Sequence, residues 1–256
     1  MSSKLNKDQK ALVSSFVRVT NAKQKDAITC LKGASWNLEP AINAYYSNSG
    51  AGSKKSAGPS EALHELYLKY KDEQHDKIMA EGIISFCKDL GVSPEDVVMF
   101  VICWYMDAKT MGEFTQEEFE GGLEEMGIDT VFSPIASLKA KIPSLRKDLD
   151  NPSVFKDVYE YAFGFSCEEN QKCLQLDVAV SIWPLLITKK KWKLIDEWCA
   201  FLQEHHKRAV SRDTWSQLLD FIRTIGSDFK KYDPNSAWPY LIDEFVERQT
   251  EGTGTA

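Results

Sequence analysis

Apolar side chains recur every three or four positions from about residue 60 to residue 248, the spacing of helices that bury one face. The first stripe consists of Leu63, Leu66, Tyr67 and Tyr70. The second consists of Ile83, Ile84, Phe86, Cys87 and Leu90. A third helix is predicted to start at Ser93-Pro94-Glu95-Asp96 and run through Trp104. Further helices are predicted over 115–126, 136–149, 152–166, 176–187, 189–206, 212–225 and 238–248. Strand-type alternation is scarce, so the pattern predicts an all-α protein.

The N-terminal residues predict a separate small bundle of three short helices over 6–48. Asn6 and Asn21 each precede a glutamine by three residues, an arrangement similar to a capping box, and Asn37 caps the third helix. The expected apolar positions are Leu12, Phe16, Val19, Ala27, Ile28, Leu31, Ala41, Ile42 and Tyr45. A Gly- and Ser-rich flexible linker over 49–60 then leads to the helical domain over 61–248, and residues 249–256 are expected to be a disordered tail.

Charge and cysteine usage narrow the class of protein. A net charge of −7 and a pI of about 5.3 disfavour a broad surface for nucleic acid or anionic membrane. The six cysteines show no zinc or redox spacing and lie mostly in apolar runs, so we expect buried thiols in a reducing compartment. The longest apolar run, residues 97–106, is too short to span a bilayer. The expected location is the nucleus and cytoplasm.

Two segments have the outline of a calcium-binding EF-hand but lack its ligands. The first starts at Asp72 and has Met79 at the hydrophobic position, with Lys77 in place of glycine and Ile83 in place of the bidentate glutamate. The second starts at Asp107, with Gly112, Phe114 and Glu118 suitably placed. Its ligand positions include Lys109 and Met111, which do not bind calcium. We expect the helix–loop–helix geometry without a metal.

No pattern of catalytic residues is found. His205 and His206 are adjacent, so on a helix they would point about 100° apart and would not converge on one site. A solvated helix end is the simpler interpretation, since basic residues suit the C-terminal dipole. Phosphate-binding loops, nucleophile elbows and zinc-protease spacings are missing. We therefore expect neither a catalytic residue nor a cofactor.

Two segments allow both a structural and a binding interpretation. The run over 97–106 is apolar around its whole circumference, which favours a central buried helix. Alternatively, Met99 and Cys103 could line a groove for a partner's apolar side chain. Asp213 and Asp243 each lie in a predicted first helical turn, where an acid complements the helix dipole or is simply solvated.

Several motifs resemble those of the defective-in-cullin-neddylation family. Ala27-Ile-Thr-Cys-Leu31, Trp36 and Ala41-Ile-Asn-Ala-Tyr45 are similar to a ubiquitin-associated (UBA) domain. The later part resembles the PONY (potentiating neddylation) domain, through Ile83-Ile-Ser-Phe-Cys-Lys-Asp-Leu90, Phe155-Lys-Asp-Val-Tyr159, Trp198 to Phe201, Glu204-His-His-Lys-Arg-Ala209, Asp213-Thr-Trp215 and Ala237-Trp-Pro-Tyr-Leu-Ile-Asp243. The resemblance covers nearly the whole chain. It implies a UBA-like bundle, a linker and a PONY domain built partly from degenerate EF-hand-like folds.

The resemblance implies a protein that acts as a scaffold-type ligase component and has no active site of its own. Family members bind the winged-helix C-terminal region of a cullin and a conjugating enzyme charged with a ubiquitin-like modifier, alongside the RING-box protein. The family's cullin-binding patch of Asp, Ala and Asp falls on Asp213, Ala237 and Asp243. Two carboxylates could pair with cullin Lys or Arg while the small alanine allows close approach.

The resemblance also implies a pocket for the acetylated N-terminal methionine of the conjugating enzyme. Carried over by position, it comprises Ile83, Met99, Ile102, Cys103, Phe114, Phe165 and Leu185. All are apolar, as an anchor pocket requires. Acetylation would matter because burying a charged amine without a partner is costly.

Two rival functions remain open at this point. The first is a ubiquitin-binding adaptor whose helical domain recruits something other than a cullin, and the second is a calcium-responsive switch. The UBA-like first loop reads Thr20-Asn21-Ala22 instead of the Met-Gly-Phe type of many ubiquitin binders, which leaves ubiquitin an open partner. Residues 130–137 are expected to form an extra loop.

Overall fold

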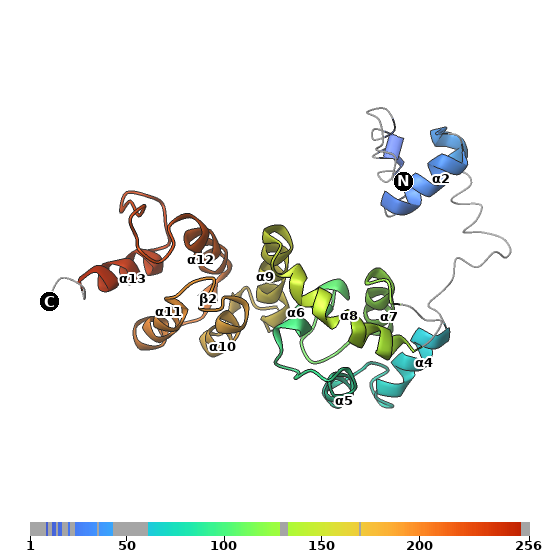
Figure 1. Ribbon diagram of the computed structural model, residues 1–256, viewed down its shortest axis with the longest axis horizontal. Helices are drawn as coiled ribbons and strands as arrows, with labels where there is room; N and C mark the ends of the chain where they lie inside the picture. Colours follow the sequence, from blue (N-terminus) through green and yellow to red (C-terminus); the bar gives the residue numbers. More distant parts are fainter. Residues whose placement is uncertain are drawn as a thin grey trace. The chain divides into compact units, whose positions relative to one another are not determined.

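The computed structural model of the chain divides into two compact units, residues 1–58 and 59–256 (Figure 1). The structure describes residues 9, 12–13, 15–16, 20, 24–34, 36–42, 61–128, 133–168 and 170–251. The prediction of an all-α protein is confirmed: within these described residues the elements are helices apart from two strands of two residues each. None of the helices in the described ranges has both the length and the apolar character needed to cross a bilayer.

The N-terminal unit has its own small apolar core. Helix α2 spans Gln24–Gly33, and residues 38–42 are also helical. The buried side chains are Val13, Phe16, Ala27, Leu31 and Ala41. These include four of the predicted core positions. The predictions for Asn6, Asn21, Val19, Tyr45 and the linker over 49–60 lie outside the described residues.

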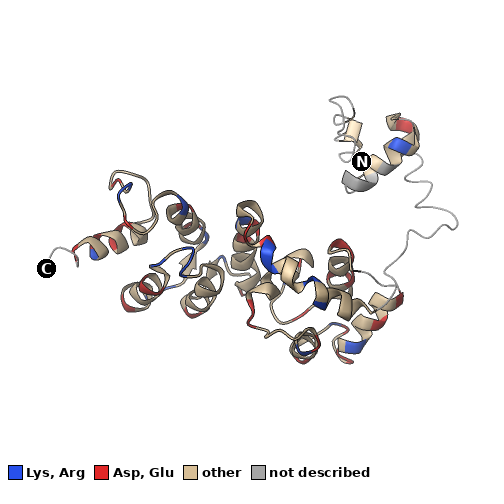
Figure 2. Cartoon of the chain, in the orientation of Figure 1, with Lys and Arg blue, Asp and Glu red and all other residues tan. Residues whose placement is uncertain are grey.

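The larger unit is a succession of helices with one short antiparallel strand pair. Its first six helices are α4 (Glu61–Tyr70), α5 (Ala80–Leu90), α6 (Val97–Tyr105), α7 (Gln116–Glu125), α8 (Pro134–Asp148) and α9 (Pro152–Ser166). The remaining elements are β1 (Cys173–Leu174), α10 (Leu176–Leu186), α11 (Ile195–Phe201), a π-helical turn η1 (Leu202–His206), β2 (Val210–Ser211), α12 (Arg212–Thr224) and α13 (Tyr240–Glu251). Acidic and basic residues are interspersed along these elements (Figure 2).

The helix pairs α4–α5 and α6–α7 are joined through their loops as in paired EF-hands. Ile78 and Phe114 form an antiparallel bridge, with N–H to carbonyl distances of 2.9 and 2.8 Å. The predicted register of the first loop is therefore wrong by one residue, because Ile78 and not Met79 takes the hydrophobic pairing position. Gly82 allows α5 to pass the end of α4, since a Cβ atom there would lie 2.1 Å from the Tyr70 carbonyl oxygen.

Side chains of the protein hold the second loop in its turn. One carboxylate oxygen of Glu118 accepts a 2.9 Å hydrogen bond from the Lys109 N–H, and the other accepts a 2.8 Å bond from the Thr115 N–H. The ammonium of Lys109 lies 2.5 Å from a carboxylate oxygen of Asp107. Lys77 of the first loop pairs with Glu113 of the second at 2.6 Å. The carboxylates of Asp107, Glu113 and Glu118 thus form hydrogen bonds and ion pairs within and between the two loops.

Several helix ends differ from the predicted ones because local hydrogen bonds decide them. Helix α6 begins at Val97, since the Asp96 carboxylate caps the Val98 N–H at 3.0 Å. Helix α11 begins at Ile195 and not at 189, because the preceding chain turns to bury Trp192, whose indole N–H lies 3.3 Å from the Gly226 carbonyl oxygen. Helix α13 continues to residue 251, and residues 252–256 lie outside the described chain.

The prediction of an extra loop over 130–137 is wrong for residues 134–137. Helix α8 starts at Pro134, so residues 134–137 form its first turn. Proline suits this position because its missing N–H would be unpaired there in any case. Residues 129–132 lie outside the described chain.

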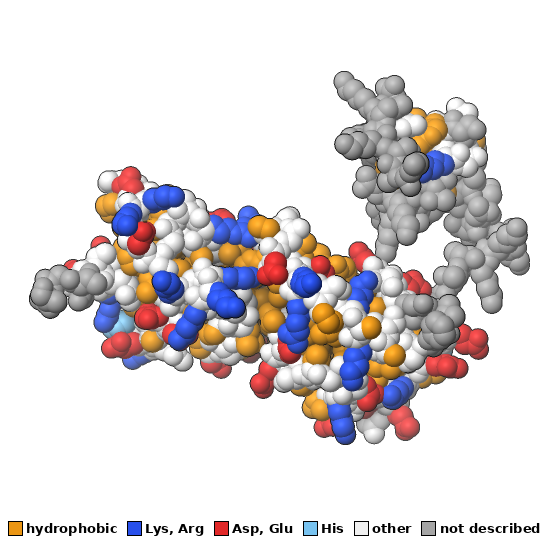
Figure 3. Space-filling view, in the orientation of Figure 1, with side chains coloured by type: hydrophobic (Ala, Val, Ile, Leu, Met, Phe, Trp, Pro, Cys, Tyr) orange, Lys and Arg blue, Asp and Glu red, His pale blue; other side chains and the backbone are white. Residues whose placement is uncertain are grey.

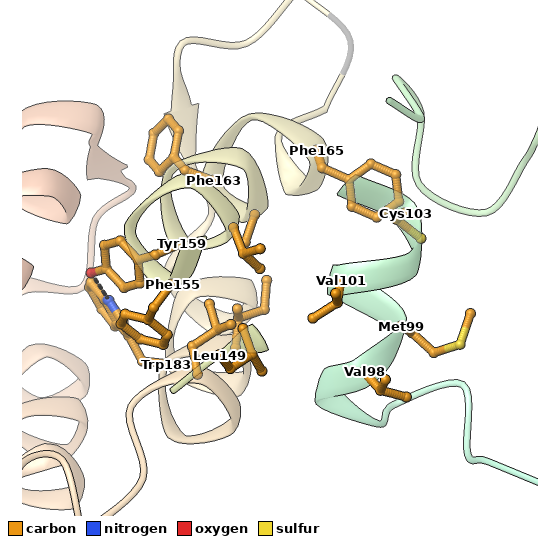
Figure 4. Packing of buried hydrophobic residues seen from close by; sticks show 14 of the residues in the cluster. Val98, Met99, Val101, Cys103, Leu149, Phe155, Tyr159, Phe163, Phe165 and Trp183 are labelled. Carbon is orange, nitrogen blue, oxygen red and sulfur yellow. Dashed lines mark hydrogen bonds between the residues drawn. The ribbon is translucent and has the colours of Figure 1, made fainter. Parts of the chain in front are cut away.

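Three stacked aromatic rings form the centre of the second half of this unit. The rings of Tyr159 and Trp215 lie 4.7 Å apart, and those of Trp183 and Trp215 lie 4.9 Å apart. The Tyr159 hydroxyl accepts a 2.9 Å hydrogen bond from the Trp183 indole (Figure 4). It also donates one of 2.8 Å to the Trp215 carbonyl. This cluster connects α9, α10 and α12, and so fixes the helix that carries Asp213.

Candidate functional site

An apolar pocket of about 250 Å³ opens beside helix α6. Its walls come from α5, the loop before α6, α6 itself, the loop before α7 and the end of α9. They consist of Ala80, Ile83, Ile84, Pro94, Met99, Phe100, Cys103, Met111, Gly112, Phe114 and Phe165. In this part of the molecule apolar side chains reach the surface between charged ones (Figure 3). The pocket is the size of one small apolar group and is too small for a large ligand.

Five of the seven residues predicted for such a pocket lie in its walls: Ile83, Met99, Cys103, Phe114 and Phe165. Met99 and Cys103 are four residues apart on α6 and therefore share one side of that helix. Figure 4 shows Cys103 beside Phe165, and it shows Met99 on the side of α6 opposite to Val101. The run over 97–106 thus has a buried side and a side that lines the pocket.

Two of the predicted pocket residues are not in the walls. Ile102 is fully buried in the core of the unit, because it lies next to Cys103 on α6 and so points about 100° away. Leu185 is 37% exposed on α10 and is not among the residues that line the pocket. For Ile102 and Leu185 a role in binding the acetylated methionine stays a prediction.

Two residues at the rim of the pocket were not among the predicted ones. Ile84 lies on α5 and is 52% exposed, and Met111 lies in the loop before α7 and is 50% exposed. Both line the pocket. Met111 could have been predicted from the sequence, since it is a large apolar residue in an otherwise polar loop. Exposed apolar side chains beside a pocket are typical of binding surfaces.

The outer wall of the pocket is held in place by Tyr161. Its ring stacks on Phe165 at a centroid distance of 5.3 Å, and Phe100 meets Phe165 edge-on at 6.4 Å. The Tyr161 hydroxyl lies 2.7 Å from the Ala108 carbonyl oxygen, to which it donates, and 3.1 Å from that of Cys103. Tyr161 thereby connects α9 to the end of α6, and the pocket is formed before any ligand arrives.

The chemistry of the pocket suits an uncharged apolar group. Its walls contain no acidic or basic side chain. Burial raises the pKa of the Cys103 thiol well above its usual value, so this group stays neutral and acts as a small apolar wall. An ammonium group entering the pocket would lose its hydration without gaining a partner, which costs several kcal/mol.

The carboxylates predicted to bind a cullin occupy the first turns of two neighbouring helices. Asp213 is exposed near the N-terminus of α12, where the Ser211 hydroxyl accepts a 3.1 Å hydrogen bond from the Thr214 N–H. Asp243 is half-buried in the first turn of α13, and one of its oxygens accepts a 2.6 Å bond from the Tyr232 hydroxyl. Both carboxylates also lie where the helix dipole favours negative charge.

Ala237 is exposed and precedes α13 in a segment that packs onto α12. The ring of Trp238, the next residue, meets Phe221 of α12 edge-on at 5.4 Å, and Tyr232 meets the same ring at 6.4 Å. These contacts explain how one alanine and one carboxylate from the segment around α13 are fixed beside the helix that carries Asp213. We call Asp213, Ala237 and Asp243 the acidic face.

Two family models match the chain. One, described as a UBA-like domain, matches residues 10–52, and the other, described as Cullin binding, matches residues 137–248. The second match includes all three residues of the acidic face, whereas most of the pocket residues precede it. The chain therefore contains a region that matches the Cullin binding model and an N-terminal region that matches a UBA-like domain, which supports a cullin as its partner.

Curated relatives identify the family. The chain is 36% identical over 221 residues to DCN1-like protein 3 of Mus musculus, which covers 81% of this chain and 71% of the relative. It is 36% identical over 218 residues to DCN1-like protein 3 of Homo sapiens, and 37% identical over 169 residues to DCN1-like protein 5 of Rattus norvegicus. These matches cover 81% and 66% of this chain, and 70% and 69% of the relatives. The chain belongs to the DCN1-like protein family, which supports a role in cullin neddylation.

Proposed function

We propose that this chain is a scaffold-type co-ligase for cullin neddylation. It would bind the winged-helix C-terminal region of a cullin through the acidic face and the N-terminally acetylated conjugating enzyme through the pocket. The RING-box protein would join the complex through the cullin. The rate gain would come from holding the charged enzyme near the acceptor lysine, with the chemistry left to that enzyme's cysteine.

The observation that carries this proposal is the presence of two chemically different surfaces in one compact unit. The pocket is apolar and uncharged, which fits an acetylated methionine. The acidic face presents Asp213 and Asp243 from adjacent helices, which fits Lys or Arg side chains of a partner. Neither surface contains a nucleophile with a neighbouring base, in keeping with a non-catalytic role.

The direct test is reconstituted cullin modification with acetylated and unacetylated conjugating enzyme. The intact chain should accelerate modification by the acetylated enzyme and lose most of this effect with the unacetylated one. Equal stimulation of both would contradict the assignment of the pocket. In the same assay Asp243→Lys should abolish stimulation by reversing a charge on the acidic face. Asp177→Lys is the matched control, because Asp177 is an exposed first-turn acid on α10, outside the acidic face.

A second candidate function is a ubiquitin-binding adaptor. It is favoured by the UBA-like match over residues 10–52, which supports ubiquitin-related binding. The two functions are compatible within one chain, and they differ in whether a cullin is needed. Retention of ubiquitin binding by Asp243→Lys together with loss of cullin binding would assign the functions to separate units.

A further inference from the structure

Tyr240 presents an uncovered aromatic ring beside the acidic face. It is the first residue of α13 and is 65% exposed, more than Ile84, Leu68, Met111 or Leu185 among the described large apolar side chains. Tyrosine combines a large apolar area with few rotatable bonds, so it binds partners at low entropic cost. An exposed ring in this position is unexplained by the packing of the protein itself.

The ring is nevertheless held in one orientation. The Tyr240 hydroxyl lies 3.2 Å from Nδ1 of His206, and Nε2 of His206 lies 3.3 Å from the Ala209 carbonyl oxygen. A carbonyl only accepts hydrogen bonds, so Nε2 carries the proton and Nδ1 accepts from the tyrosine. An exposed side chain that is already ordered loses little further freedom on binding.

The π-helical turn explains how His206 reaches Tyr240. Residues 202–206 form this turn, which ends at Lys207 with a left-handed φ of 53° and a 3.1 Å bond from its N–H to the Leu202 carbonyl. Within the turn, His205 stacks on Phe201 at 5.5 Å and contacts Arg248. The two adjacent histidines therefore point apart and support opposite ends of α13. π-Helical turns are often found at functional sites.

Tyr240 connects the two halves of the acidic face. It follows Ala237 by three residues and precedes Asp243 by three, a spacing that places Tyr240 and Asp243 on the same side of α13. Through His206 and Ala209 it also contacts the segment that leads to the N-terminus of α12 and Asp213. The ring thus shares one side of α13 with the Asp243 carboxylate and is hydrogen-bonded to the segment that precedes α12.

We infer that Tyr240 is the aromatic anchor of the cullin-binding face, and that the cullin lays the aliphatic stem of a lysine or arginine across its ring. The charged end of that side chain then pairs with the Asp243 carboxylate. A basic side chain is the suitable occupant because the ring face attracts cations and its stem covers apolar area. This inference rests on the proposed function, of which it names the central contact.

The test compares the affinity of full-length variants for a cullin C-terminal region in complex with the RING-box protein, by calorimetry. Tyr240→Ala should weaken binding by about tenfold or more, as hot-spot aromatics do. Tyr240→Phe should weaken it by only about twofold to threefold, since it keeps the ring and loses the hydrogen bond that orients it. Leu68→Ala is the control, because Leu68 is 50% exposed on α4. The unfolding midpoints should be unchanged, since both residues are exposed.

The outcomes separate this inference from the proposed function. In one outcome wild type binds, Asp243→Lys does not, and Tyr240→Ala binds within about twofold of wild type. Tyr240 is then not the anchor, and the assignment of the acidic face is retained. If Tyr240→Ala and Tyr240→Phe are equally impaired, the ring is not the contact, and the inference fails. If wild type itself does not bind the cullin, both the proposed function and this inference are contradicted.

Discussion

The hydroxyl of Tyr232 donates a 2.6 Å hydrogen bond to Oδ1 of Asp243. Desolvation and the nearby carboxylate both raise the pKa of Tyr232, so the hydroxyl keeps its proton and remains a donor. One oxygen of Asp243 is therefore used inside the protein, and in the proposed function Oδ2 would pair with the cullin. The bond fixes the direction of that second oxygen.

Tyr232→Phe should weaken cullin binding about threefold to tenfold and lower the free energy of unfolding by about 1 kcal/mol, the usual contribution of one hydrogen bond. Calorimetry and denaturant titration measure the two effects. Tyr105→Phe is a matched control, because the Tyr105 hydroxyl lies 3.4 Å from the Asp148 carboxylate at another place in the fold. If both variants reduce cullin affinity equally, the loss in Tyr232→Phe does not come from its hydrogen bond to Asp243.

The rim of the pocket can be changed without disturbing the core. Ile84→Asp and Met111→Asp introduce charges at positions that are half exposed, so the stability of the fold should change little. Each should weaken binding of the acetylated conjugating enzyme about tenfold, because an apolar contact is replaced by a solvated charge. Fluorescence anisotropy with an acetylated N-terminal peptide of that enzyme measures this.

Leu68→Asp controls for added negative charge, since Leu68 is equally exposed and does not line the pocket. Cullin binding should be retained in all three variants. Loss of peptide binding by the Leu68 variant, or unchanged binding by both rim variants, would contradict the assignment of the pocket.

Lys191 should behave differently from the lysines around it. Its ammonium lies 3.3 Å from the centroid of the Phe155 ring and donates to the Leu149 carbonyl at 3.2 Å. Desolvation lowers the pKa of Lys191 to about 8, with Asp150 opposing and Arg223 adding to the shift. At pH 8 about half of this amine should be neutral, so it should be acylated faster than Lys190 and Lys193 in trace labelling followed by mass spectrometry.

The lowered pKa of Lys191 also makes the free energy of unfolding depend on pH in a defined direction. Because the unfolded chain binds this proton more tightly, the contribution of Lys191 to stability rises as pH increases from about 8 to the usual lysine value of about 10.4. Lys191→Met should lack that rise in denaturant titrations across this pH range. Labelling of Lys191 at the rate of its neighbours, or an identical pH profile in the variant, would contradict the lowered pKa.

Tyr159→Phe should cost about 2–4 kcal/mol of unfolding free energy. Its hydroxyl satisfies both the Trp183 indole and the Trp215 carbonyl, and both are buried. Removing the hydroxyl leaves the Trp183 indole N–H without a partner in the core, at a cost of roughly 1–3 kcal/mol, and also removes the hydrogen bond to the Trp215 carbonyl, which contributes about 1 kcal/mol. Guanidinium titration measures the loss. A change below about 0.5 kcal/mol would mean that other groups or water replace the hydroxyl.

The sequence predicted the helices well where apolar residues alternate with polar ones. Helices α9, α10 and α12 begin where predicted and end within one residue of the prediction, and the side chains of Asn151 and Ser211 cap α9 and α12. The errors occur where side-chain hydrogen bonds override periodicity, as at Asp96, which ends the turn before α6, and at Trp192, which is buried ahead of α11. The Trp192 bond depends on a tertiary neighbour, Gly226, that no local pattern contains, whereas the Asp96 cap is a local bond between residues two positions apart.

The sites illustrate the same limit. In the run over 97–106 every position is apolar, so periodicity could not separate Met99 and Cys103, which line the pocket, from Ile102, which is buried. The family resemblance suggested the pocket, and the fold decided which residues form it. For His205 and His206, their adjacency correctly argued against one convergent site. Their separate contacts with Arg248 and Tyr240 follow from the π-helical turn, which the sequence did not reveal.

The measurement that tests the account most directly is a mixing experiment in reconstituted cullin neddylation. Ile84→Asp should fail to recruit the acetylated conjugating enzyme, and Asp243→Lys should fail to bind the cullin, so neither variant alone should stimulate transfer. If the chain works by holding both partners on one body, an equimolar mixture of the two variants should remain as inactive as each alone. Recovery of wild-type stimulation by the mixture would show that the two surfaces act independently, and would contradict the scaffold.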